Sequence, residues 1–177
     1  NEAEIDTLII DTPPPDPFSP AKSTDVLAFS GSGDIEVDDV IGEIGLVNLS
    51  AMSGQIVFGD NFGNGTDFLI GAINGGSEIE LTGGAVSELV FLGGNTGNLL
   101  VQGFDATAGV GDVLDFGAMG ISSLAELSIT EIVQGGANDY VITLNANPGL
   151  WSITLEDVGD GLLLAVQNRI DFDGVVC

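Results

Sequence analysis

Short apolar segments recur through most of the chain, and this feature most limits how the chain can fold. The segments lie at residues 35–37, 44–47, 56–58, 68–70, 79–81, 89–91, 99–101 and 113–116. Neighbouring segments begin at short intervals, and the gaps between them are rich in Gly, Asn, Asp, Ser and Thr. Such short strands at such regular spacing are typical of a β-solenoid or of an antiparallel sandwich or barrel.

The length of these segments favours the solenoid. A sandwich or jelly roll would usually need strands of about 5 to 6 residues, and most of these segments are shorter. A solenoid with two strands in each coil would place about 18 to 22 residues in one coil. We therefore expect an all-β chain with a β-solenoid or β-roll-like body over residues 25–116. A β-sandwich or jelly roll is the alternative.

Beyond residue 116 the apolar segments become longer. A short helical turn is expected at 122–127, with a serine at its N-terminus. Residues 117–177 then form a C-terminal meander in this prediction, with Tyr140 and Trp151 in its core. Its antiparallel strands, joined by Gly- and Asn-rich turns, are expected at 129–133, 139–144, 151–155 and 162–166.

Residues 1–24 form an N-terminal segment of different composition. Residues 4–10 are rich in side chains that favour strands. Residues 13–17 are proline at all but one position, which favours a stiff, extended spacer. The strand has two candidate partners: a sheet of its own chain, or a neighbouring subunit, because the ends of solenoids expose strand edges that pair readily. The second alternative predicts self-association into a homo-oligomer or filament.

The charge balance is strongly acidic. The chain has 27 acidic residues, two basic residues (Lys22 and Arg169) and no histidine, for a formal net charge of −25. Such a chain repels nucleic acids and anionic membrane surfaces, and it contains no run of about 18 apolar residues that would predict membrane insertion. Self-repulsion also opposes compaction. The composition therefore indicates either bound cations or adaptation to high salt.

The types of residue present argue against an enzyme. Without histidine, the chain lacks the commonest general base. The single cysteine, Cys177, is the last residue, which leaves no internal disulfide and no cysteine-based zinc site. Pairs of carboxylates can act as acid and base, but among 27 acidic residues such pairs arise by chance. We therefore expect no catalytic residues.

The stretch 60–71 is the strongest candidate for a metal site. It has the form x-Gly-x-Gly-x-Asp-x-Leu-x, with glycines that allow tight turns and positive φ angles. The carbonyls of Gly63 and Gly65 and the carboxylate of Asp67 are the kind of oxygen ligands that Ca²⁺ prefers, and Asp60 is a candidate second carboxylate. An ordinary Gly-Asp turn between two strands is the alternative interpretation.

Asp112 and Asp115 are the next candidate calcium ligands. Asp112 directly precedes the last apolar segment of the predicted body, at 113–116, and Asp115 lies within it. A turn at the edge of a strand, without a metal, is the alternative. Ca²⁺ is the one cofactor that we expect.

Several segments after residue 110 occur in a characteristic order. They are Gly-Asp-Val-Leu-Asp-Phe at 111–116, Ser-Leu-Ala-Glu-Leu at 123–127, Asp-Tyr-Val-Ile-Thr-Leu at 139–144, Ser-Ile-Thr-Leu-Glu-Asp-Val at 152–158 and Ile-Asp-Phe at 170–172. This order resembles the C-terminal region of RTX (repeats-in-toxin) proteins, which are exported by type I secretion. The resemblance implies a parallel β-roll capped by a strand meander, an uncleaved C-terminal export signal and folding driven by extracellular Ca²⁺.

The resemblance also implies coils of two nonapeptides, in which aspartates from stacked turns share one ion. The positions two nonapeptides before and after Asp67 are occupied by Leu49 and Ala85, so we expect a degenerate roll. The function expected from these features is that of a secreted, extracellular, calcium-binding structural protein, such as a self-assembling matrix, surface-layer or filament subunit. The alternative is the C-terminal calcium-binding and secretion module of a larger RTX adhesin, toxin or enzyme.

Overall fold

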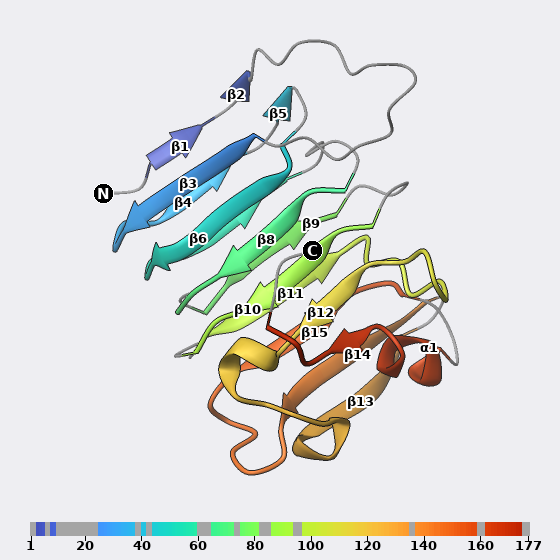
Figure 1. Cartoon of the computed structure of the whole chain (residues 1–177). Coiled ribbons are helices and arrows are strands. Elements are labelled where there is room, and N and C mark those ends of the chain that lie inside the picture. Colours follow the sequence, from blue (N-terminus) through green and yellow to red (C-terminus); the bar gives the residue numbers. More distant parts are fainter. Residues whose placement is uncertain are drawn as a thin grey trace.

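The chain forms a β-solenoid in which two mainly parallel sheets enclose one hydrophobic core, as seen in the computed structural model (Figure 1). The predicted all-β solenoid is therefore confirmed. The structure describes residues 3–5, 8–9, 25–37, 40–41, 44–59, 65–72, 75–81, 86–93, 97–134, 137–158 and 162–174.

Successive strands of the body alternate between the two large sheets, apart from one short strand at residues 40–41. The six-stranded sheet contains, in spatial order, β16 (Ile170–Asp171), β12 (Val113–Asp115), β10 (Glu88–Phe91), β8 (Asp67–Ile70), β6 (Leu46–Met52) and β3 (Val26–Gly31). The eight-stranded sheet contains β1 (Ala3–Ile5), β4 (Ile35–Val37), β7 (Ile56–Phe58), β9 (Ser77–Glu80), β11 (Asn98–Gln102), β15 (Ser152–Leu155), β14 (Ala137–Leu144) and β13 (Leu127–Gln134). A small sheet pairs β2 (Leu8–Ile9) with β5 (Val40–Ile41).

The register of the parallel strands sets the length of a coil. Ile35 pairs with Ile56, and Phe68 pairs with Leu89. Both pairs have the sequence separation of the hydrogen bond between Glu88 and Asp67, which is 21 residues. This coil length lies within the range expected for two strands per coil and is longer than a pair of nonapeptides.

The direction of strand pairing decides between the two predicted folds. The pairing of β8 with β10 is parallel, whereas a sandwich or jelly roll is built from antiparallel strands. The alternative fold is therefore excluded.

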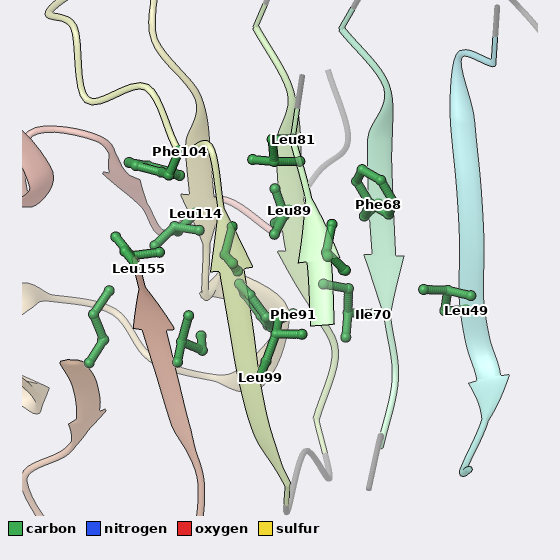
Figure 2. Packing of buried hydrophobic residues seen from close by; sticks show 14 of the residues in the cluster. Leu49, Phe68, Ile70, Leu81, Leu89, Phe91, Leu99, Phe104, Leu114 and Leu155 are labelled. Atoms are coloured by element: carbon green, nitrogen blue, oxygen red, sulfur yellow. The ribbon is translucent and has the colours of Figure 1, made fainter. Parts of the chain in front are cut away.

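Parallel pairing stacks equivalent side chains of successive coils into columns. Inward positions of the six-stranded sheet form one such column, with Val47, Phe68, Leu89 and Leu114 in register. All four side chains are buried. In Figure 2 the labelled apolar side chains of both sheets point into the space between them. Burial of each large apolar side chain contributes about 1.5–3 kcal/mol, so these columns supply most of the driving force for stacking.

Stacked aromatic rings fill the part of the core that lies near the C-terminal coils. Phe116 stacks on Phe91 and on Trp151, with ring centroids 5.0 and 5.7 Å apart. Tyr140 is buried, and its hydroxyl donates to Glu131 Oε1 and accepts the N–H of Leu162. Trp151 and Tyr140 are therefore core residues, as the sequence predicts.

The C-terminal meander continues the eight-stranded sheet. β15 pairs parallel with β11 and antiparallel with β14, which pairs antiparallel with β13. The fourth predicted strand, at 162–166, is wrong, because this segment lies in the helix α1 (Leu163–Gln167). Short apolar runs do not distinguish strand from helix by periodicity. Here leucine and alanine favour a helix, which buries Val166 and leaves Leu164 exposed.

The remaining helices of the described ranges are single turns. The expected helical turn at 122–127 is present as the 3₁₀ helix η2 (Leu124–Glu126), and η1 (Gly117–Met119) lies just after β12. Glu126 Oε1 accepts the N–H and the hydroxyl of Ser122 at the start of η2. None of these helices approaches the roughly 20 residues that a bilayer-spanning helix needs.

The N-terminal strands pair within their own chain. β1 pairs parallel with β4, and β2 pairs parallel with β5. The described residues of the predicted strand at 4–10 therefore pair with strands of their own chain, as in the first of its two alternatives. Pairing of this segment with a neighbouring subunit stays a prediction, and the proline-rich spacer at 13–17 lies outside the described residues.

A tight corner between coils gives a direct test of the coil stacking. A Cβ atom added at Gly54 would lie 2.1 Å from the carbonyl oxygen of Gly33, on the preceding coil. Gly54→Ala should therefore force two coils apart and lower the free energy of unfolding by about 1–3 kcal/mol. Urea unfolding followed by circular dichroism measures this loss.

Gly93→Ala is the matched control, because an added Cβ at Gly93 meets nothing within 4 Å. The control should keep the urea midpoint of the parent protein. Equal midpoints for the two variants would contradict the close stacking of Gly54 on Gly33.

Candidate metal site

Acidic residues lie at the start of three neighbouring strands of the six-stranded sheet, two of them in register (Asp67 and Glu88) and the third (Asp112) one position earlier. Asp67 begins β8, Glu88 begins β10, and Asp112 directly precedes β12. We call these three residues the acidic corner. All three are buried. Because the strands are parallel neighbours, coil stacking brings the three strand starts to one edge of the sheet.

The carboxylate of Asp67 links its coil to the next one. Its Oδ1 accepts the N–H of Glu88 at 2.9 Å. The preceding Thr66 donates its hydroxyl to the carbonyl of Ile44, at 2.8 Å, on the coil before. Gly65 has a φ of 76°, a left-handed conformation that a side chain disfavours. Gly65 and Thr66 therefore hold Asp67 where its carboxylate binds the backbone of the next coil.

Asp112 makes similar bonds with both of its oxygens. Oδ1 accepts the N–H of Ser87, and Oδ2 accepts the N–H of Asp105, each at 2.8 Å. Burial raises the pKa of Asp112, and these two N–H groups oppose the rise. The guanidinium of Arg169 donates to the carbonyls of Asp112 and Gly111. The one basic side chain of the described ranges thus lies at this end of the acidic corner.

Asp115 lies elsewhere, on the outer face of the six-stranded sheet. In register it follows Leu69 and Val90 and precedes Asp171. It is fully buried, and its Oδ1 accepts the N–H of Gly117 at 2.8 Å. Its Oδ2 has no hydrogen-bond partner. Burial raises the pKa of Asp115, the N–H groups of Gly117 and Gly174 oppose this rise, and the charges of Asp173 and Asp171 add to it.

The structure thus brings together only part of the predicted ligand set. Asp67 and Asp112 lie at the same edge of the sheet but two strands apart and one register position apart, Gly65 lies just before Asp67, and Asp115 is separate. Asp60 and Gly63 lie outside the described residues. In the part of the chain that the structure describes, no three acidic side chains already converge on a point that could hold a metal ion. Ligation of Ca²⁺ by these residues stays a prediction.

Glu88 belongs to the acidic corner, and the sequence analysis misses it. It stands one coil after Asp67, whereas the nonapeptide pattern suggests a shorter spacing and meets Ala85 instead. The spacing of the apolar segments contains the missing signal. Segments 68–70 and 89–91 have the same separation as Asp67 and Glu88, so aligning the two segments places both acidic residues at one position.

Comparison with known proteins adds no further identification. No protein-family model matches the chain, and no curated protein or solved structure matches it significantly.

The buried carboxyls predict how stability changes with pH. The pKa values of Asp112 and Asp115 are raised by burial, so the folded protein holds these protons more tightly than the unfolded chain. An unfolded aspartate has a pKa of about 4. As the pH falls from 7 toward that value, the folded protein binds protons at these two carboxyls before the unfolded chain does, so the free energy of unfolding rises. The melting temperature should therefore be higher at pH 5 than at pH 7.5.

Salt separates this effect from the general repulsion of a chain with a net charge of −25. Concentrated NaCl screens repulsion between exposed charges but acts far less on buried groups. The rise in melting temperature on acidification should thus persist in concentrated NaCl. A melting temperature that does not change with pH in high salt would contradict the role of the two buried carboxyls.

Proposed function

We propose that this protein is a secreted, acidic, calcium-binding structural protein that assembles through the ends of its solenoid into extracellular polymers. The observation that carries the proposal is that each end of the solenoid presents a terminal strand with an exposed valine. Figure 1 shows β1 and β3 at one end of the stack and β13 at the other. The sequence resemblance to RTX proteins supports the extracellular location.

The terminal strands have the features of assembly surfaces. β13 is the last strand of the eight-stranded sheet, and Val133 on it is 80% exposed. β3 is the last strand of the six-stranded sheet, and Val26 at its start is 60% exposed. Unpaired backbone groups on an edge strand readily pair with another chain. Contacts between unlike ends do not close on themselves unless the rotation allows, so the product would be a filament.

Charge makes such assembly dependent on cations. Two molecules of net charge −25 repel each other. Ca²⁺ binds to carboxylates and carbonyl oxygens, and extracellular calcium modules bind it with dissociation constants of about 10⁻⁴ to 10⁻³ M. The acidic corner and its neighbouring turns offer such oxygens. Calcium would both reduce the repulsion and stabilise the coils that carry the terminal strands.

The test is assembly of the full chain in millimolar CaCl₂ and in EDTA at matched ionic strength, followed by light scattering and electron microscopy. We expect polymers in CaCl₂ and monomers in EDTA. Val133→Glu should abolish the polymers, because a charged side chain on an edge strand opposes pairing. Val26→Glu should do the same, because a filament joins unlike ends, whereas pairing of two β13 strands would give a closed dimer that only Val133→Glu disrupts.

Val110→Glu is the matched control, because Val110 is 62% exposed in the loop before β12 and receives the same added charge. This variant should assemble as the parent protein does. A parent chain that stays monomeric in CaCl₂, or three variants that all assemble equally, would refute end-to-end assembly.

The second candidate function is a calcium-binding and secretion module of a larger RTX protein. The favouring observation is that Ile170–Asp171, part of the segment that resembles RTX C-termini, forms β16 and pairs with β12. Fusing residues 97–177 to a passenger protein and measuring its export by a type I system tests this candidate. Export that depends on the fused segment would favour the module over the subunit.

A further inference from the structure

A buried carboxylate oxygen without a partner lies on the outer face of the six-stranded sheet. Asp115 is 0% exposed, and its Oδ2 makes no hydrogen bond. The N–H of Gly174 lowers the pKa of this carboxylate, although it makes no hydrogen bond with Oδ2. An ionised oxygen that has lost its water without gaining a partner destabilises the fold strongly, so such a group calls for a proton or a cation.

The surroundings of Asp115 are acidic. Asp171 is its direct partner in the parallel pairing of β12 with β16, so the two side chains leave the sheet on the same face. Neighbouring strands lie about 4.8 Å apart, which allows both carboxylates to reach one ion. Asp173 follows two residues later, and its charge and that of Asp171 act on Asp115. Asp171 and Asp173 are exposed.

The C-terminal segment is held closely over this site. A Cβ atom added at Gly117 would lie 2.4 Å from the carbonyl oxygen of Phe172 and 2.5 Å from the nitrogen of Gly174. The N–H of Phe116 donates to the carbonyl of Asp171 at 3.0 Å. The backbone that carries Asp171 and Asp173 is thus fixed against the backbone that carries Asp115.

We propose that Asp115, Asp171 and Asp173 bind one Ca²⁺ ion at this edge of the six-stranded sheet. The inference rests on the calcium-binding part of the proposed function and names a site for it apart from the acidic corner. Asp115 would supply the buried oxygen, and the two exposed carboxylates would turn toward it, since the three do not already converge. Carboxylates and water in irregular geometry suit Ca²⁺ better than the smaller Mg²⁺.

The competing account is a neutral Asp115 that carries a proton on Oδ2. The two accounts differ in what Asp115→Asn does. The variant keeps an Oδ1 acceptor for Gly117 and removes a buried charge, so in EDTA it should melt at or above the temperature of the parent protein. If the proton account holds, its calcium affinity is also unchanged. If the site binds Ca²⁺, the affinity falls.

The experiment is calorimetric titration of the full chain with CaCl₂, repeated with MgCl₂. We expect a calcium site that weakens at least tenfold in Asp115→Asn and that prefers Ca²⁺ to Mg²⁺. Asp173→Asn should weaken it too, and this exposed position keeps the test valid if Asp115→Asn fails to fold. Glu36→Gln removes the same charge on β4, a strand of the other sheet, and should bind as the parent protein does.

The outcomes separate this site from the broader proposal. Calcium binding that is lost in Asp67→Ala but unchanged in Asp115→Asn and Asp173→Asn would overturn the site and leave the proposed function standing. No heat of calcium binding, with no calcium shift of the melting temperature, would overturn both. A tenfold loss in both Asp115→Asn and Asp173→Asn, with Glu36→Gln unchanged, would establish the site.

Discussion

The parallel, in-register pairing of successive coils is the constraint on which the rest of the structure depends. It places each side chain directly over its equivalent in the next coil, as Phe68 lies over Val47 and Leu89 over Phe68. For apolar residues this stacking builds the core. For acidic residues it places like charges side by side, which a chain of net charge −25 with two basic residues cannot offset by ion pairs alone.

Backbone N–H groups stabilise part of this negative charge. Asp67 and Asp112 each accept an N–H from a neighbouring coil, and a carboxylate that accepts N–H bonds tolerates burial better than a bare one. The carboxylates therefore act as structural links between coils as well as candidate ligands. Asp115 differs, because only one of its oxygens is satisfied. Asp67 and Asp112 thus differ from Asp115, which keeps a buried oxygen that needs a proton or an ion.

The architecture can be predicted from the sequence, but only part of the candidate site can. Short apolar segments between glycine-rich turns suffice to predict a solenoid, because their period follows directly from the length of a coil. The run at 162–166 resembles a strand because a short apolar run carries no periodicity, and its helix follows from local propensity and from the burial of Val166. The grouping of Asp115 with Asp171 depends on strand pairing between segments far apart in the chain. No local motif contains that information.

The central claim is that a divalent cation stabilises this acidic solenoid. Thermal unfolding of the full chain in CaCl₂ and in EDTA, at matched ionic strength, tests it most directly. Calcium at about a hundredfold excess over its dissociation constant should raise the melting temperature by roughly 5 to 10 °C, since ligands that bind only the folded state stabilise it. Identical melting temperatures in CaCl₂ and EDTA would contradict the account.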